Sequence, residues 1–261
     1  MMILDRIIAA KRDEVAHLKY SKPVSELKKI IRDLPPPRDF KKVLNGDDCS
    51  IIAEIKRSSP SRGRLREDFD PLEIASIYEE NGAAAISVLT DRKFFEGDKA
   101  YLSAIKNIVD MPLLRKDFII DSCQIYETRV LGGDAVLFIV RLLENEQLRE
   151  YIQLADTLWL DSLVEVHTRE ELDRAIAAGA DIIGINNRNL ETFSTNLTTS
   201  INLASCVPED RIIVSESGIN TRKDIKILMK ADIHSFLVGE VLMRADDIGG
   251  KLRELLGESD D

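Results

Sequence analysis

The chain has 261 residues, with 36 Lys and Arg against 46 Asp and Glu, which gives a formal net charge of −10 at pH 7. This acidic balance argues against nucleic acid or an anionic membrane as a partner, although a local pocket for a small anion remains compatible with it. Hydrophobic residues make up 44% and charged residues 31% of the chain, which is typical of a soluble globular protein rather than a disordered one.

The three cysteines, Cys49, Cys123 and Cys206, are odd in number and widely spaced, so we expect neither a disulfide framework nor a zinc site. The N-terminus lacks the apolar core of a signal peptide. The longest strongly apolar run, residues 135–140, is too short to span a bilayer. These features predict a cytoplasmic protein in a reducing compartment, with no membrane partner.

Residues 1–48 are predicted to form a helical extension rather than a separate domain. Apolar residues recur at helical spacing in two stretches, 4–18 and 24–34, and the three prolines at 35–37 end any helix there. We expect the extension to fold back over the mouth of the domain that follows, where its apolar stripe would exclude water.

Residues 49–261 alternate short β-branched runs with amphipathic stretches. Their spacing of about 26 residues leaves room for one helix and two short loops between strands, which predicts a parallel sheet. Glycines at 82, 133 and 179 fall between an amphipathic stretch and a strand and are candidate helix C-caps. The eight candidate strands begin near Ser50, Ala84, Pro112, Ala135, Asp161, Asp181, Arg211 and Ser235.

Eight such units predict an α/β protein with the (β/α)8 architecture of a TIM barrel. An open doubly wound sheet is less compatible with the sequence, because no G-x-G-x-x-G motif follows the first strand. In a barrel of this kind the active site lies at the carboxyl ends of the strands. The residues that end each candidate strand are therefore the candidates for chemistry.

Several of these strand ends carry groups that can move protons. Glu54 and Lys56 lie two residues apart on one strand and share its face with Ile52, so we expect that face to point into the barrel. Lys116 and Glu165 end two other strands. Each one alone could be an ordinary solvated side chain, but together they supply general acids, general bases and carbonyl polarisers at one barrel mouth.

Two glycines follow the last two candidate strands. Gly218 and Gly239 would let backbone N–H groups approach a ligand closely, and barrels often build a phosphate site from these two loops. Glycine is common in such loops, so its position after these particular strands is what favours a phosphate site.

Taken together, the strand ends resemble those of the indole-3-glycerol-phosphate synthase family. The resemblance covers nearly the whole chain, including the helical extension, and its segments follow one another in the family's order. The matching segments are residues 52–61, 86–90 with Phe95, 114–118, 163–167, 183–190 and 215–219.

The resemblance implies a lyase of tryptophan biosynthesis. Its substrate would be 1-(2-carboxyphenylamino)-1-deoxyribulose 5-phosphate, and its products indole-3-glycerol phosphate, carbon dioxide and water. The family needs no metal or organic cofactor. The expected partner is thus a phosphorylated small molecule, and we expect a monomer.

The resemblance also implies roles for individual residues. Lys116 would protonate or polarise the ketone oxygen, with Lys56 near the substrate carboxylate and Glu165 as the partner acid or base. The implied catalytic residues are Glu54, Lys56, Lys116, Glu165, Asn186 and Ser217; the substrate-binding residues are Ser59, Phe95, Phe118, Leu137, Ile139, Arg188 and Glu216; the phosphate-binding residues are Gly218, Gly239 and Glu240.

Glu240 departs from the family pattern, since many members carry Ser after this glycine. A carboxylate that faced a phosphate would repel it by about 1 kcal/mol at 4 Å in water, and by more where solvent is excluded. We therefore expect the amide of Glu240 to contact the phosphate while its carboxylate turns away toward a cation.

Two other classes of function remain open at this stage. One is a different phosphate-binding barrel enzyme. It could be phosphoribosylanthranilate isomerase, which should have an Asp/Cys acid–base pair, or a Schiff-base aldolase, in which borohydride would trap the lysine nucleophile. The other is a non-enzymatic ligand-binding barrel, which would not need acids and bases at its strand ends. Fold alone would not separate these.

Overall fold

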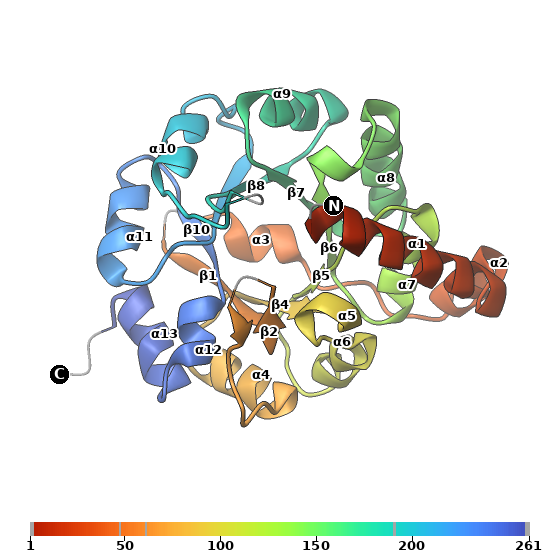
Figure 1. Cartoon of the computed structure of the whole chain (residues 1–261), viewed down its shortest axis with the longest axis horizontal. Helices are drawn as coiled ribbons and strands as arrows, with labels where there is room; N and C mark the ends of the chain where they lie inside the picture. Colours follow the sequence, from red (N-terminus) through yellow and green to blue (C-terminus); the bar gives the residue numbers. More distant parts are fainter. Residues whose placement is uncertain (1–2, 47, 61, 190–191, 259–261) are drawn as a thin grey trace.

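The computed structural model describes residues 3–46, 48–60, 62–189 and 192–258. Within them, eight parallel strands close into a barrel, each hydrogen-bonded to two neighbours (Figure 1). The predicted α/β TIM barrel is confirmed, and each strand begins within one residue of its predicted start. The strands are β1 (Ser50–Ile55), β4 (Ala85–Leu89), β5 (Leu113–Lys116), β6 (Ala135–Ile139), β7 (Asp161–Val166), β8 (Ile182–Asn186), β9 (Ile212–Glu216) and β10 (Ser235–Val238).

A ring of helices surrounds the barrel, one after each strand (Figure 1). Most begin at a side-chain cap, as when Asp70 accepts a hydrogen bond from Leu72 N at the start of the first ring helix. The ring consists of α4 (Pro71–Glu80), α6 (Lys99–Lys106), α7 (Ser122–Val130), α8 (Asn145–Thr157), α9 (Arg169–Ala178), α10 (Thr198–Ala204), α11 (Arg222–Met229) and α13 (Ile248–Leu256).

Short elements decorate the loops at the carboxyl ends of the strands. A two-stranded hairpin follows β1, and a short helix follows each of β4, β6 and β10. They are β2 (Ser58–Ser59), β3 (Gly63–Arg64), α5 (Arg92–Phe95), the 3-10 helix η1 (Val140–Leu142) and α12 (Glu240–Arg244).

Alternate strand residues fill the barrel interior, while their neighbours pack outward against the helices. Ile52, Leu114, Leu163 and Val214 belong to one interior cluster and are all buried. Because side chains two residues apart share a face, the residues two positions later in each strand must also point inward, at the mouth. The apolar interior therefore fixes which side chains reach the mouth.

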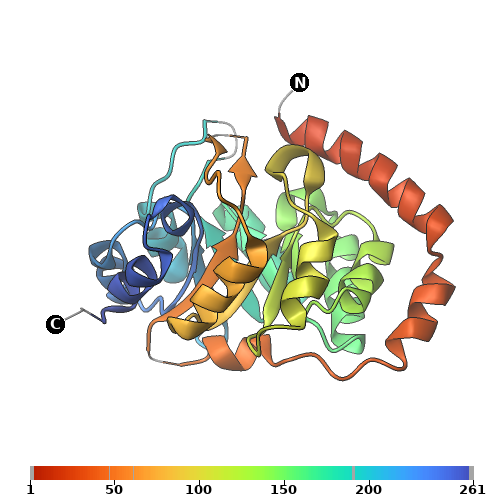
Figure 2. The same ribbon diagram turned by 90° about the horizontal axis from the view of Figure 1, so that it is seen from below.

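The N-terminal extension consists of α1 (Ile3–Ser21), α2 (Val24–Ile31) and α3 (Phe40–Leu44). Phe40 and Leu44 are buried with the interior cluster and close the amino end of the barrel. Figure 2 shows the chain passing from α3 at the lower edge, up the side through α2, to α1 at the opposite end. The first helix, α1, reaches the mouth with Ile3, Leu4 and Ile7. The last helix, α3, closes the opposite end of the barrel.

One of the predicted glycine C-caps is wrong. Gly179 caps α9 in the left-handed conformation with φ 89°, as expected. After α7, however, Gly132 adopts that conformation with φ 87°, and Gly133 does not. A Cβ on Gly133 would lie 2.7 Å from Thr128 Cγ2, so close packing against α7 requires the second glycine.

Among the described residues, no helix is long and apolar enough to cross a membrane.

Candidate active site at the mouth of the barrel

A pocket opens at the carboxyl ends of the strands, beneath the start of α1. Every residue predicted for the site lines it, which brings side chains from all eight strand ends or their loops to one cavity. These residues are Glu54, Lys56, Ser59, Phe95, Lys116, Phe118, Leu137, Ile139, Glu165, Asn186, Arg188, Glu216, Ser217, Gly218, Gly239 and Glu240. Ser61 and Leu190, which belong to the matching segments, lie outside the described residues.

Four of these side chains form one layer across the barrel, here called the charged layer: Glu54, Lys116, Glu165 and Glu216. They come from β1, β5, β7 and β9, which are alternate strands of the closed sheet. Such layering is how TIM barrels fill their interior. Each member lies two residues after one of the four interior apolar residues described above, so the charged layer rests on an apolar floor.

Lys116 is the centre of the charged layer. Its Nζ donates to Glu165 Oε2 at 3.0 Å and to Glu216 Oε2 at 2.5 Å. All three side chains are nearly buried, so the ion pairs are little screened by water. Burial lowers the pKa of Lys116, but the charges of Glu216 and Glu165 outweigh burial and raise it above its usual value. The ammonium form is therefore the stable one.

The two carboxyl partners of Lys116 differ in protonation. Burial raises the pKa of Glu216 to about 7, and the nearby charge of Glu165 adds to this rise while Lys116 opposes it. For Glu165, burial also favours the neutral form, but Lys116 outweighs burial and lowers the pKa to about 2. The pKa values of the two carboxyl groups are thus shifted in opposite directions, which favours Glu165 as a base and Glu216 as an acid.

Gly184 on β8 makes room for Glu216. A Cβ at this position would lie 2.2 Å from Glu216 Oε1 and 3.2 Å from Leu163 Cδ1. Any larger residue would push the buried carboxyl away from Lys116. Oε1 of Glu216 is buried and has no hydrogen-bond partner among the described residues, and the Glu216 residue lines the pocket.

The other polar residues surround the charged layer. Lys56 forms an ion pair with Glu54, which places a second ammonium at the rim. Asn186 hydrogen-bonds Glu165, and its Oδ1 accepts the backbone N–H of Arg188 at 2.9 Å. Asn186 thus orients Glu165 and fixes the start of the loop after β8.

One side of the pocket is apolar. The rings of Phe95 and Phe118 lie 5.9 Å apart between centroids, at an interplanar angle of 39°. Leu137 and Ile139 of β6 line the same pocket. At this separation the two rings contact each other, and with Leu137 and Ile139 they form a slot along one side of the pocket, against whose aromatic and aliphatic walls a planar ring can lie.

The other side of the pocket has polar backbone and paired charges. Ser217 and Gly218 both adopt left-handed conformations, with φ 68° and 81°, which is strained for a serine. The Glu240 carboxylate accepts from Arg188 Nη2 at 3.0 Å and pairs with Arg62 Nε at 3.1 Å. The expectation that this carboxylate turns toward a cation matches these contacts.

Several pocket residues escaped the sequence analysis. Arg62, Phe193, Thr195 and Asn220 come from the loops after β1, β8 and β9, and Ile3, Leu4 and Ile7 from α1. Strand periodicity does not extend into loops, so nothing in the local pattern points to the loop residues. The sequence predicted that the extension would fold back over the mouth, and Ile3, Leu4 and Ile7 of α1 lie there, but it did not indicate which residues of α1 would line the pocket.

The pH dependence of stability tests the state of Glu216. A glutamate whose pKa rises from 4.5 to about 7 on folding stabilises the native state at low pH and loses that stabilisation between those values. The glutamine of Glu216→Gln cannot ionise, so this variant does not lose stability as the pH rises. We therefore expect its unfolding free energy relative to wild type to increase as pH rises from about 5 to 8, by on the order of 3 kcal/mol.

Urea unfolding at pH 5, 6, 7 and 8 measures this difference, with Glu209→Gln at an exposed position as the control. The control should show a flat difference across the series. A flat difference for Glu216→Gln as well would mean that Glu216 is ionised throughout the range.

No group of three or more His, Cys, Asp or Glu side chains within the described ranges is placed to hold a metal ion.

Comparison with known proteins identifies the family. The sequence profile described as indole-3-glycerol phosphate synthase matches residues 4–255. An indole-3-glycerol phosphate synthase of Legionella pneumophila (strain Lens) is 50% identical over 255 residues, covering 97% of this chain and 98% of the relative. One from Alkaliphilus metalliredigens is 48% identical with the same coverage.

Solved structures with low sequence identity share the fold. A 3-hexulose-6-phosphate synthase has a TM-score of 0.65 at 14% identity, covering 80% of this chain and 99% of that one. A thiamine phosphate pyrophosphorylase from Pyrococcus furiosus has a TM-score of 0.60 at 17% identity, covering 79% and 93%. Both support the barrel and nothing about chemistry.

The predicted family and activity, a carboxy-lyase of tryptophan biosynthesis, are confirmed by the whole-length sequence matches. The geometry and these matches lead to one conclusion: this chain belongs to the indole-3-glycerol phosphate synthase family.

Proposed function

We propose that the pocket closes the indole ring of 1-(2-carboxyphenylamino)-1-deoxyribulose 5-phosphate, with Lys116 as the acid. The observation that carries this proposal is the Lys116 ammonium, held between Glu165 and Glu216 at the base of a pocket with one apolar and one polar side. The reaction needs a proton donor at a ketone, an apolar site for an arene and a polar site for a phosphate, and the pocket offers all three.

In the first step the aromatic carbon attacks the ketone, and negative charge develops on the ketone oxygen. The Lys116 ammonium stabilises this charge and donates a proton. Lys56 at the rim pairs with the substrate carboxylate until carbon dioxide leaves, and its own position is held by Glu54.

Dehydration then requires a base for a ring proton and an acid for the departing hydroxyl. Glu165 suits the base, because its pKa of about 2 keeps it ionised, and Asn186 orients it. Glu216 suits the acid, because burial raises its pKa to about 7 and so favours the protonated form more than in a free glutamate.

The two sides of the pocket orient the substrate. Its anthranilate ring lies against the contacting rings of Phe95 and Phe118 and the side chains of Leu137 and Ile139. Its phosphate lies at the opposite side, which Gly218 and Gly239 line, and it accepts from backbone N–H groups there. Ser59, Arg188 and Ser217 contact the intervening hydroxyl and phosphate oxygens.

Indole fluorescence tests the activity directly. The purified chain should convert the named substrate to a fluorescent indole product with release of one carbon dioxide per turnover, without added metal or cofactor. No fluorescence change with authentic substrate would refute the proposal. Borohydride should leave the activity unchanged, because no Schiff base forms, whereas inactivation would favour an aldolase.

The partner and compartment proposals follow from the same site and from the composition. We infer a monomer that acts in the cytoplasm on a phosphorylated small molecule and binds no nucleic acid. Light scattering during chromatography measures the mass in solution, and a mass of two or more chains would contradict the monomer.

Glu240 gives a sharper test of the phosphate side. Its carboxylate pairs with Arg188, Arg62 and, at 3.7 Å, Arg244, so Glu240→Ser frees guanidinium groups, of which Arg188 and Arg62 line the pocket and can contact a bound phosphate. We expect kcat within a few fold of wild type and equal or tighter substrate binding. Glu240→Pro should weaken binding, because it removes the backbone N–H that we assign to the phosphate.

Steady-state KM and inhibition by inorganic phosphate measure both variants of Glu240. Lys230→Ser, at an exposed position, controls for the loss of one charged side chain. A loss of about tenfold in affinity for Glu240→Ser, worth ~1.4 kcal/mol, would show that the carboxylate itself supports binding.

A further inference from the structure

The buried face of α1 contains one residue that breaks its apolar pattern. Its buried positions are Ile7, Lys11, Val15 and Leu18, which follow one another at the spacing of a single helix face. Lys11 is only 1% exposed. A buried ammonium costs several kcal/mol of desolvation unless it is well paired, so its partners must account for its presence here.

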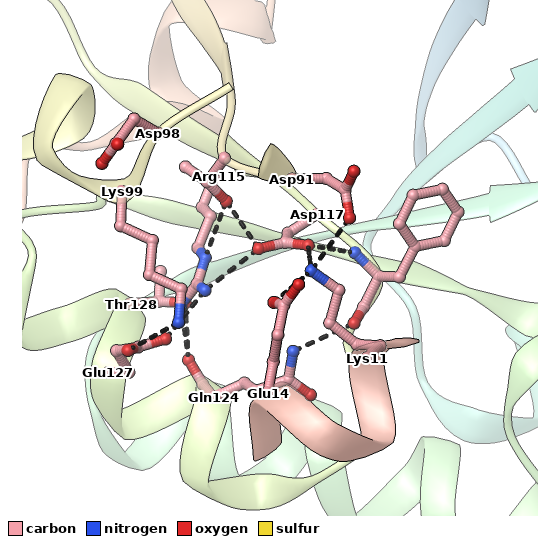
Figure 3. A network of polar contacts seen from close by, with 12 residues as sticks. Lys11, Glu14, Asp91, Asp98, Lys99, Arg115, Asp117, Gln124, Glu127 and Thr128 are labelled. Carbon is pink, nitrogen blue, oxygen red and sulfur yellow. Dashed lines mark hydrogen bonds and ion pairs between the residues drawn. The ribbon is translucent and has the colours of Figure 1, made fainter. Parts of the chain in front are cut away.

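Lys11 bonds two buried carboxylates from different strand ends. Its Nζ lies 2.8 Å from Asp117 Oδ1 and 3.1 Å from Asp91 Oδ2, and it also donates to Glu14 at 2.7 Å (Figure 3). Asp91 and Asp117 are 1% and 2% exposed. Lys11 is therefore the contact through which α1 joins the loop after β4 to the end of β5.

Asp117 hydrogen-bonds residues that precede and follow it in the chain. It directly follows Lys116, and its Oδ1 accepts the backbone N–H of Phe118 at 2.8 Å. Its Oδ2 accepts from Arg115 at 3.1 Å and from Thr90 at 2.6 Å. With Lys11 on Oδ1, the carboxylate is fixed in both position and rotation, and so is the backbone that carries the Phe118 ring.

Asp91 fixes the backbone that carries the other ring of the pair, that of Phe95. Its Oδ1 caps α5 by accepting from Phe94 N at 2.8 Å, and its carbonyl accepts from Gly97 N at 2.9 Å. The four-residue helix between these two bonds carries Phe95. Lys11 thus contacts the residue that positions each ring of the Phe95–Phe118 pair.

We infer that Lys11 is a positioning residue that sets the separation of Phe95 and Phe118, and so determines how well the site binds the aromatic part of its substrate. It does so from outside the pocket, since the lining contains Asp117 but not Lys11. The same helix places Ile3, Leu4 and Ile7 over the mouth, so one lysine ties the cover of the site to its aromatic slot. This inference rests on the proposed function, because it takes the slot to hold the anthranilate ring.

A second lysine on the same helix separates this role from simple anchoring. Lys19 donates to Asp121 at 2.5 Å, and Asp121 caps α7. This pair also ties α1 to the barrel, but the Lys19 side chain is 54% exposed and it contacts neither Asp91 nor Asp117. Lys19→Met is therefore the matched control for Lys11→Met.

The experiment compares ligands with and without the ring. Inhibition constants are measured for the product, indole-3-glycerol phosphate, and for glycerol 3-phosphate, which lacks the ring, together with KM and kcat for the substrate. For Lys11→Met we expect KM and the product inhibition constant to rise by about tenfold, the scale of one lost charge-assisted hydrogen bond. The glycerol 3-phosphate constant should stay within about twofold, because its contacts lie on the other side of the pocket.

Asp91→Asn gives an independent arm if Lys11→Met folds poorly, because it keeps Lys11 paired with Asp117 and should show the same ring-selective loss. Lys19→Met should leave all constants at wild-type values. Three results would overturn the inference. They are an equal loss of affinity for both ligands, a loss of affinity in Lys19→Met as large as that in Lys11→Met, and no loss of affinity in either Lys11→Met or Asp91→Asn. A wild-type chain without turnover would instead refute the proposed function.

Discussion

Lys116→Met is expected to lower kcat by at least about 10²-fold, the usual scale for a positioned acid. The methionine side chain fills nearly the same space but offers no proton and no positive charge to the developing alkoxide. Glu165→Gln should cause a loss of similar size, because the amide keeps the shape of the base but cannot accept a proton. The indole fluorescence assay under saturating substrate measures both.

Folding has to be checked separately, since Lys116→Met leaves Glu165 buried without its cation. Circular dichroism and the melting temperature show whether each variant keeps its structure. Lys230→Met, at an exposed position, is the control and should retain wild-type turnover. A folded Lys116→Met variant with kcat within a few fold of wild type would remove Lys116 from the reaction.

Phe40→Ala has the largest expected effect on stability. Phe40 is fully buried with the interior cluster at the amino end of the barrel. Truncating such a ring removes its burial and leaves a cavity, which costs about 3–5 kcal/mol of unfolding free energy. Urea unfolding monitored by circular dichroism gives this value.

Activity should respond differently from stability in this variant. Phe40 closes the end of the barrel opposite the pocket, so kcat and KM of the folded fraction should remain close to wild type. Tyr20→Ala, where the side chain is 89% exposed, should change neither quantity. A loss of less than about 1 kcal/mol for Phe40→Ala would mean that α3 merely rests against the barrel and contributes little to its core.

The strands and the inward-facing site residues could be predicted because one periodicity governs both. Once Ile52, Leu114 and Leu163 are taken as interior residues, the residues two positions later must point into the mouth. Glu54 is predicted in this way from the face that it shares with Ile52, and Lys116 and Glu165 are predicted from their positions at strand ends. Asn186 and Glu216 also end their strands, and the family resemblance supplied their roles.

The extension was harder to predict because amphipathicity describes one face of a helix and not what it meets. The periodicity of residues 4–18 and 24–34 predicted helices, and the structure has α1 and α2 at these positions. That the five-residue α3 would close the opposite end of the barrel depends on tertiary packing alone. Lys11 interrupts an apolar stripe, which marks it as unusual, but its carboxylate partners lie 80 and 106 residues away in sequence.

Loop residues at the pocket were also beyond the reach of sequence patterns. Arg62 and Thr195 face the cavity because their loops fold over it, and loops have no period that fixes side-chain direction. The pairing of Glu240 with a cation could be expected from charge alone, whereas the identity of its partners, Arg188, Arg62 and Arg244, required the structure.

Each half of the chain contributes two members of the charged layer, but the hydrogen bonds of Lys116 cross from one half to the other. Lys116 belongs to the first four strands, and both of its carboxylate partners belong to the last four. A half-barrel cut between β6 and β7 would therefore hold Lys116 without its two hydrogen-bond acceptors, or Glu165 and Glu216 without their lysine. Catalysis can begin only once the final strands have closed the barrel. After denaturation, recovery of turnover is therefore a stricter measure of barrel closure than recovery of helix content.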